Sequence, residues 1–184
     1  MTDLLQLYTD LVILTIDQMS LYFQATLTRV WSLMGQTPIV RMQPQRDHIH
    51  FYGALELRTG RQIALPAESQ NGEITADFIR ILLMLFPTQH ILLLLDRAPW
   101  HKGTPLSSLF DENTARMDVL YYPPACPELN PQEHVWSQAR EAISHNHAYS
   151  RFQTLIDDFE TYLNESLFQT NFMEKYAPPF LCEF

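Results

Sequence analysis

The chain has 184 residues, of which 46% are hydrophobic and 18% are charged. This composition excludes an intrinsically disordered chain and is typical of one globular domain with a sizeable core. The net charge of −9 argues against a protein that binds nucleic acid unaided, because such binding usually relies on Lys and Arg at phosphates.

The first part of the chain predicts antiparallel strands. Residues 11–17 are an apolar run that is expected to be a buried strand ending on Asp17. Residues 28–43 predict a short hairpin around a glycine. The run 48–57 alternates apolar and polar residues as a strand does, and a Thr-Gly turn leads into a further strand at 61–67.

Helices and strands alternate in the rest of the chain. Residues 72–87 place apolar side chains at helical spacing and end at a proline. Residues 90–96 form an apolar strand of the kind that is buried on both faces of a sheet. The other predicted elements are a short helix at 104–113, a strand at 117–123, a helix at 131–145 and an amphipathic helix at 151–168.

This order of elements predicts the architecture. Antiparallel strands followed by strands separated by helices indicate an α/β fold, with a mixed central sheet that is antiparallel in its first part and flanked by helices. No repeat, low-complexity segment or linker divides the chain, so residues 1–184 are expected to form a single domain.

Two features of the sequence favour a cytoplasmic protein. The longest apolar runs, residues 11–16 and 91–96, are far too short to span a bilayer, and no secretory signal is visible. Without such a signal, Cys126 and Cys182 are expected to be thiols rather than a disulfide or a metal-binding pair.

Positive charge is concentrated early in the chain. Residues 29–61 carry five arginines against two acids, a balance of +3, and include Arg41 and Arg46. Residues 150–184 carry two basic residues against six acids, a balance of −4. The first segment can therefore meet phosphate, whereas the tail cannot.

Three acids are candidates for chemistry. Asp17 and Asp96 each end a predicted apolar strand, and functional groups in open α/β sheets gather beyond the carboxyl ends of strands. Glu133 begins a helix after another strand and can reach the same edge. Clustered carboxylates suit Mg²⁺ or Mn²⁺. The alternative, from spacing alone, is that each acid is only a turn or cap residue.

The stretch LYYPPACPELNPQEHVW, residues 120–136, leads into that last helix. Asn130 can cap the helix, Pro131 suits its first position, and Glu133 stands where a capping box places an acid. The proline-rich approach can equally serve to hold Glu133 in a fixed place. Periodicity does not separate a cap from a ligand at this position.

Four segments carry a resemblance to a known family. They are TIDQMSLYFQATLTRVWSLMGQTPIV, HFYGALELRTGRQIAL, ILLLLDRAPWHKG and YYPPACPELNPQEHVW. In this order the segments resemble the DDE catalytic domain of the IS630 and Tc1/mariner-like transposases. The resemblance implies an RNase H-like fold with Asp17, Asp96 and Glu133 as the catalytic and metal-binding triad. Thirty-six residues separate Asp96 from Glu133, similar to the short second interval of that family.

The resemblance also implies a reaction and its partners. Two Mg²⁺ or Mn²⁺ ions would activate water to nick DNA at a transposon end, and the freed 3′-hydroxyl would then attack target DNA. Asp17 and Asp96 would hold both ions, and Glu133 would complete the coordination of one. The expected setting is a homodimer on DNA in the bacterial nucleoid.

The loop after Asp96 supplies further candidates for DNA binding. Arg97 and Lys102 are predicted phosphate contacts, although exposed basic residues are commonly only solvated. His101 belongs to the family motif and is a candidate to contact the scissile phosphate or to order the loop beside Asp96; the alternative is that it is only packed, as a His beside a Trp often is. Trp100 is expected to anchor the loop rather than to stack on a base.

Three features depart from the family pattern. Relatives carry N-terminal helix-turn-helix modules that recognise transposon ends, and this sequence shows none before its first strand; this predicts either the second part of a split transposase or a truncated copy. Gln18 stands where a Glu often follows the first Asp and cannot supply its charge. The acidic balance predicts weak DNA affinity without a partner that brings basic surface.

Two other functions compete with a transposase catalytic domain. A truncated or repurposed fragment would keep the fold and act as a non-catalytic protein-interaction module. An RNase H-like nuclease would act on RNA–DNA hybrids. The PELNPQEHVW block favours a transposase over that nuclease.

Overall fold

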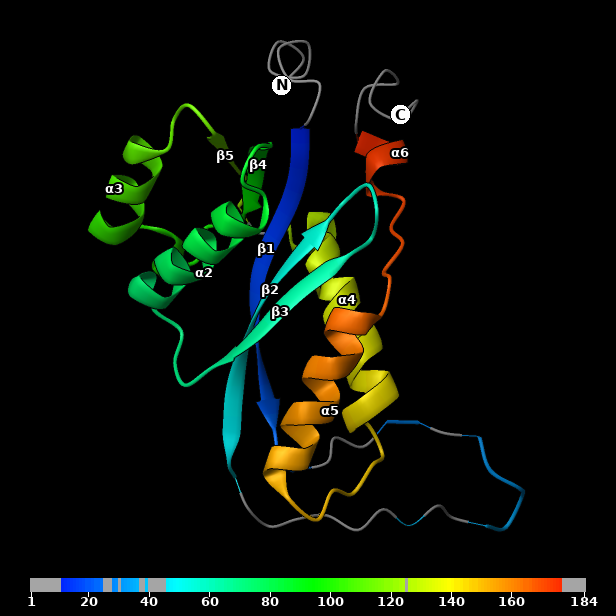
Figure 1. The fold of residues 1–184 in the computed structure, drawn as a ribbon. Coiled ribbons are helices and arrows are strands. Elements are labelled where there is room, and N and C mark those ends of the chain that lie inside the picture. The colour runs from blue at the N-terminus through cyan, green and yellow to red at the C-terminus, as the bar shows by residue number, and fades with distance from the viewer. Residues whose placement is uncertain are drawn as a thin grey trace.

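A computed structural model describes residues 11–24, 28–29, 31–36, 39, 46–124 and 126–176 of the chain. Its centre is a five-stranded sheet with the strand order β3-β2-β1-β4-β5 (Figure 1). The strands are β1 (Leu11–Tyr22), β2 (His48–Glu56), β3 (Gln62–Ala67), β4 (His90–Leu95) and β5 (Met117–Tyr121).

The sheet is mixed, as the sequence predicts. Strand β2 pairs antiparallel with both β1 and β3, whereas β4 pairs parallel with β1 and β5. Each parallel connection passes through a helix, because parallel neighbours need a crossover. The predicted architecture, a mixed sheet with an antiparallel first part and flanking helices, is confirmed.

The prediction that the first strand ends on Asp17 is wrong. Strand β1 continues to Tyr22 because the residues beyond Asp17 stay paired with β2, beginning with the pair Asp17–Gly53. Its parallel pairing with β4 stops one residue earlier, at Ile16–Leu95. Asp17 therefore lies where β1 separates from β4, and not at the end of β1.

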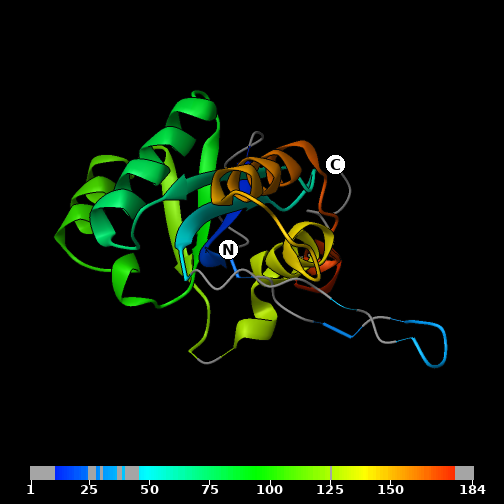
Figure 2. The ribbon, with the colours of Figure 1, turned by 90° about the horizontal axis from the view of Figure 1, so that it is seen from below.

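The sheet divides the core into two clusters. Successive side chains of a strand point to opposite faces, so Leu92 and Leu94 of β4 join one cluster while Ile91, Leu93 and Leu95 join the other. Helices α4 and α5 cover the first face, and α2 and α3 cover the second (Figure 2). This burial on both faces explains why β4 is apolar throughout.

The helices largely follow the predicted ranges. They are α2 (Gly72–Leu85), α3 (Thr104–Glu112), α4 (Pro131–Ala139), the π-helical η3 (Arg140–Ser144), α5 (Phe152–Glu165) and α6 (Phe172–Tyr176), with short 3₁₀ turns η1 (Pro99–His101) and η2 (Pro127–Leu129). No helix in the described ranges is long and apolar enough to cross a membrane.

Two predicted elements differ from the structure or fall outside it. The final amphipathic helix ends at Glu165 instead of residue 168, because Leu167 forms a bridge with Arg61 and the Phe168 N–H donates to the Gly60 carbonyl. Of the hairpin predicted at 28–43, the described residues form a turn at Gly35 without a strand, and the rest lies outside the described residues.

Candidate active site

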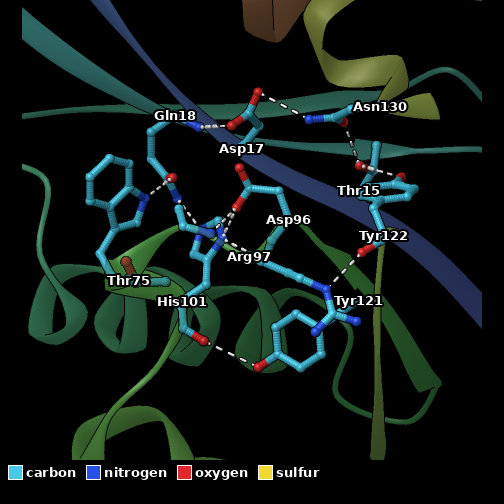
Figure 3. Close-up of polar contacts among 12 residues, drawn as sticks. Thr15, Asp17, Gln18, Thr75, Asp96, Arg97, His101, Tyr121, Tyr122 and Asn130 are labelled. Carbon is cyan, nitrogen blue, oxygen red and sulfur yellow. Dashed lines mark hydrogen bonds and ion pairs between the residues drawn. The ribbon is translucent and has the colours of Figure 1, made fainter. Parts of the chain in front are cut away.

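The sheet register brings Asp17 and Asp96 together. Ile16 and Leu95 are the last residues that pair β1 with β4. Asp17 directly follows Ile16, and Asp96 directly follows Leu95. Figure 3 shows the two carboxylates as neighbours, with an oxygen of Asp96 turned toward Asp17. Because the strands run parallel, the two residues that follow their last shared pair lie side by side as predicted, although only β4, and not β1, ends there.

Asp17 is held by three nitrogen donors. Its carboxylate Oδ1 accepts from the backbone N–H of Gln18 at 2.8 Å, and its Oδ2 accepts from Asn130 Nδ2 at 3.1 Å and Trp136 Nε1 at 3.3 Å. The residue is only 8% exposed. These contacts fix the buried carboxylate in one orientation.

The surroundings of Asp17 make its negative charge unfavourable. Burial raises the pKa of Asp17 to about 7, the Gln18 N–H opposes this rise, and the charges of Glu133 and Asp96 add to it. A carboxylate in such a position gains from a cation close to it, since the cation would offset both the lost hydration and the like charges.

A second set of bonds supports Asn130. The Tyr122 hydroxyl donates to Thr15 Oγ1 at 2.9 Å, and the Thr15 hydroxyl donates to Asn130 Oδ1 at 3.1 Å. Asn130 Oδ1 also accepts from the N–H of Gln132, so this side chain caps α4 as predicted. The same amide orients Asp17 with its nitrogen, a role that the capping pattern alone does not reveal.

Trp136 reaches Asp17 because residue 53 has no side chain. Gly53 lies opposite Asp17 in the sheet, and a Cβ built on Gly53 would lie 2.4 Å from an atom of the Trp136 ring. Real Cβ atoms are essentially never so close to another heavy atom. The glycine therefore leaves the space beside β2 that the Trp136 ring occupies while its Nε1 donates to the carboxylate.

Replacing Gly53 by alanine is expected to displace Trp136 and to lower the free energy of unfolding by about 1–3 kcal/mol, as overpacking of a core does. Urea denaturation would measure the loss, and the indole N–H signal of Trp136 would report the broken bond to Asp17. Gly72→Ala is the matched control, because the nearest atom to its new Cβ would be 3.7 Å away. Equal stability of the two variants would contradict this account.

Asp96 lies in the loop between β4 and η1 and is more open. Its Oδ1 accepts from the N–H of Ala98 at 2.9 Å and from His101 Nδ1 at 2.5 Å. Burial acts to raise the pKa of Asp96, but these bonds and the positive charge of Lys102 outweigh it and hold the pKa below its usual value. Within the described part of the chain, Oδ2 of Asp96 accepts no hydrogen bond.

His101 is a fully buried neighbour of Asp96. Its Nε2 lies 3.0 Å from Gln18 Nε2, and Gln18 Oε1 accepts from Trp100 Nε1 at 2.6 Å. Of the two roles considered for His101, ordering of the loop therefore fits the structure as it stands, and contact with a phosphate stays a prediction. Trp100 anchors the loop, as expected.

Glu133 comes from the first turn of α4 and is exposed. It lines one cleft of about 330 Å³ together with Asp96 and Asn130. In the described residues its carboxylate makes no capping-box bond to the Asn130 N–H; Asn130 alone caps the helix. The side chain is thus free to turn into the cleft, which favours the positional interpretation of the proline-rich approach.

The basic candidates have different settings. Arg97 is exposed, donates from Nε to the Tyr122 carbonyl at 3.1 Å and lies over the ring of Tyr121. Lys102 and Arg46 are exposed, the former in the loop after η1. Arg41 lies outside the described residues. Their roles at phosphates remain predictions.

The three acids form no finished metal site. Among the described residues, no group of three or more His, Cys, Asp or Glu side chains is arranged to hold a metal ion. The donor chemistry nevertheless fits Mg²⁺ or Mn²⁺, since carboxylate oxygens are the ligands that these ions prefer. The raised pKa of Asp17 is a second sign of fit, because a cation would offset the burial that causes most of the rise and the like charges of Glu133 and Asp96 that add to it.

Comparison with known proteins identifies related sequences. A family model described as DDE superfamily endonuclease matches residues 12–156. The insertion element IS630 uncharacterized 39 kDa protein of Shigella sonnei is 26% identical over 144 residues, which is 76% of this chain and 41% of that protein. The uncharacterized protein y4pE/y4sA of Sinorhizobium fredii is 34% identical over 67 residues, 36% of this chain and 46% of that protein.

Solved structures with a similar fold include several of Mos1 transposase. Its paired-end complex with the left transposon end has a TM-score of 0.66 at 16% identity and covers 90% of this chain and 52% of that chain. The Mos1 paired-end complexes with Mn and with Mg have TM-scores of 0.63 and 0.66. This chain spans less than half the length of the two related proteins from Shigella sonnei and Sinorhizobium fredii and about half that of the Mos1 transposase chain in the left-end complex.

Proposed function

The chain belongs to the DDE superfamily endonucleases, and on that basis we propose that it is a transposase catalytic domain that cleaves DNA strands and transfers them with divalent metal ions. Its five-stranded mixed sheet with flanking helices is RNase H-like. The observation that carries the proposal is the meeting of Asp17 and Asp96 at the point where β1 and β4 separate, with Glu133 on the cleft beside them.

In this proposal Asp17, Asp96 and Glu133 hold two Mg²⁺ or Mn²⁺ ions. Bound ions of this kind activate an attacking oxygen and stabilise the leaving oxygen of a phosphodiester. The Mos1 complexes with Mn and with Mg support the choice of ions, and the oxygen-only donor set supports it independently.

The remaining side chains of the site position these acids. Asn130 and Trp136 hold one oxygen of Asp17, whereas the backbone N–H of Ala98 and the ring of His101 hold one oxygen of Asp96. Glu133, which is exposed, would join once a cation is bound. Fixed carboxylates of this kind need little reorganisation when charge develops on the phosphate.

Substrate DNA would lie along the exposed loop after β4. Arg97 and Lys102 flank Asp96 and are the nearest candidates for phosphate contacts, and Arg41 and Arg46 are candidates from the segment before β2. A net charge of −9 makes these few cations a weak DNA-binding surface. We therefore propose that a helix-turn-helix segment, encoded separately or elsewhere in a longer protein, supplies recognition of the transposon ends, and that two copies act on paired ends.

The test is nicking of supercoiled plasmid by the purified chain at low ionic strength, where phosphate contacts are strongest. We expect conversion to the nicked circle with Mn²⁺ or Mg²⁺ and none with a chelator. An RNA–DNA hybrid offered in parallel separates the reactions: preference for the hybrid would favour an RNase H-like nuclease. Binding of both Mn²⁺ and the plasmid without cleavage of either substrate would overturn the catalytic role and favour the non-catalytic fragment.

A further inference from the structure

Three side chains and the carboxylate of Asp96 form one line of hydrogen bonds. Trp100 Nε1 lies 2.6 Å from Gln18 Oε1, Gln18 Nε2 lies 3.0 Å from His101 Nε2, and His101 Nδ1 lies 2.5 Å from Asp96 Oδ1 (Figure 3). His101 has no exposed surface, so water does not compete for its ring. The line begins on a helical turn of the loop, crosses to β1 and returns to the loop.

Elementary chemistry sets the direction of every bond in this line. An indole N–H can only donate, so the oxygen of the Gln18 amide must face Trp100 and its NH₂ group must face His101. A group that receives a hydrogen bond from NH₂ must offer a lone pair, which places no proton on His101 Nε2. The proton of the neutral ring is therefore on Nδ1.

The other end of the line requires the same arrangement. Oδ1 of Asp96 already accepts from the Ala98 N–H, and an ionised carboxylate can only accept. His101 must therefore donate to it from Nδ1. The backbone carbonyl of Asp96 lies 3.3 Å from the same nitrogen, and the Tyr121 hydroxyl donates to the His101 carbonyl at 3.1 Å, so the ring and its backbone are both held.

We propose that Gln18 is a positioning residue for the site: together with Trp100 it fixes His101 as the Nδ1–H tautomer, and through His101 it turns the free oxygen Oδ2 of Asp96 toward Asp17. This inference rests on the proposed function, because it assigns Oδ2 as the oxygen that meets the cation. Both donors to Asp96 converge on Oδ1 and leave the lone pairs of Oδ2 unused by the described residues.

A glutamine suits this position better than the glutamate of the family pattern. An ionised glutamate can accept from Trp100 but has no hydrogen to give to His101 Nε2, so the ring would need a proton on Nε2 to keep the contact. Only the amide both accepts from the indole and donates to the imidazole. Glutamine in place of glutamate at position 18 therefore determines that residue 18 donates to His101 Nε2.

The tautomer can be read directly from the ¹⁵N signals of the imidazole, because a ring nitrogen with a proton and one without it have well-separated chemical shifts. The His101 signals among those of seven histidines are assigned with a His101→Asn spectrum. We expect a protonated Nδ1 and an unprotonated Nε2 in the wild type. Two variants break the line: Gln18→Met removes both bonds of the amide, and Trp100→Phe removes only the indole donor.

In both variants we expect the ¹⁵N signal of His101 Nε2 no longer to be that of a nitrogen without a proton. We expect the affinity for Mn²⁺, measured by calorimetry, to fall about 10–100-fold, as for other groups that orient a metal ligand. Gln153→Met, which changes an exposed glutamine on α5, is the control and should change neither signal nor affinity. Gln18→Glu is expected to move a proton onto Nε2.

The outcomes separate this inference from the proposed function. A proton on Nε2 in the wild type, or an unchanged His101 signature in both line-breaking variants, would overturn the inference. A merely structural role for Gln18 would lower the melting temperature without altering the ring signals. The expected tautomer in a wild-type chain that binds no Mn²⁺ and nicks no DNA would overturn the proposed function, while the positioning of His101 by Gln18 would stand.

Discussion

Exchanging Asp96 for asparagine is expected to slow metal-dependent nicking of DNA at least about a thousandfold while the fold stays intact. A thousandfold loss corresponds to about 4 kcal/mol of transition-state stabilisation, which is of the size attributed to a metal ion at a phosphoryl group. The exchange removes one oxygen and changes neither the size nor the shape of the side chain.

The hydrogen bonds around residue 96 determine which of its two carboxylate oxygens the NH₂ group replaces. Ala98 N–H and His101 Nδ1 both donate to Oδ1, so the amide oxygen of an asparagine must take that place. Its NH₂ group then stands where Oδ2 was, next to Asp17. A donor at this point cannot bind a cation, whereas every bond that orders the loop is kept.

Calorimetry with Mn²⁺ and the plasmid assay would measure the two losses, and urea denaturation would check the fold. Asp111→Asn, an exposed aspartate on α3, is the matched control. We expect the control to keep both activities and to unfold within about 0.5 kcal/mol of the wild type, as surface substitutions usually do, and Asp96→Asn to remain folded with a single cooperative unfolding transition. Nicking at the wild-type rate by Asp96→Asn would remove Asp96 from the reaction.

The meeting of Asp17 and Asp96 is predictable because strand ends are easy to recognise in this sequence. Residues 90–96 are so uniformly apolar that only a buried central strand fits them, and the run at 11–17 has the same character. Parallel pairing of two such runs places the acids that follow them side by side, although β1 itself continues beyond Asp17. The length of β1 was predicted wrongly because its second half is held by β2, a partner that periodicity within β1 does not reveal.

The supports of Asp17 are much harder to predict. Asn130 is recognisable as a helix cap and Trp136 as part of an apolar helix face, yet their bonds to Asp17 depend on how α4 lies on the sheet. Gly53 carries no local signal at all, since its importance comes from being opposite Asp17 in the register. The bonds of Asn130 and Trp136 to Asp17 join residues more than a hundred positions apart in the chain, which no local pattern encodes.

Gln18 is an intermediate case. The sequence shows that a glutamine stands beside Asp17, and comparison with the family pattern shows that a charge is missing there. Only the structure adds that its amide lies between Trp100 and His101. A glutamine at position 18 counts against activity when charge alone is considered. In our proposal its hydrogen bonds orient Asp96 through His101.

A second large effect is expected in the dependence of stability on pH. The metal-free protein should lose stability attributable to Asp17 as the pH rises from about 4 to about 7. The cause is the pKa of this carboxyl, which burial raises from 3.8 to about 7 with further contributions from Glu133 and Asp96. In this range the folded chain keeps a proton on Asp17 that the unfolded chain has already released, so each step of rising pH favours the unfolded state.

The size of the effect follows from the same linkage. One pH unit between the two pKa values changes the free energy of unfolding by about 1.4 kcal/mol, so the whole range amounts to roughly 4 kcal/mol. Asp96 acts in the opposite sense, because its lowered pKa contributes stability that is lost as the pH falls. The quantity to measure is therefore the difference in the free energy of unfolding between the wild type and Asp17→Asn. This variant removes the titration of Asp17 and leaves the other titrating groups in place.

Chemical denaturation at a series of pH values with a chelator present would measure this difference. We expect the wild type to lose stability relative to Asp17→Asn between pH 4 and pH 7, and the difference to become constant above that range. Saturating Mg²⁺ at pH 8 should restore about 3 kcal/mol to the wild type at a hundred times the dissociation constant, because a cation that binds only the folded state stabilises it by mass action. A difference that stays flat from pH 4 to pH 8 would mean that Asp17 is ionised at neutral pH without a cation. The three donors around it would then suffice to hold its charge, and the need for a metal ion to offset it would disappear.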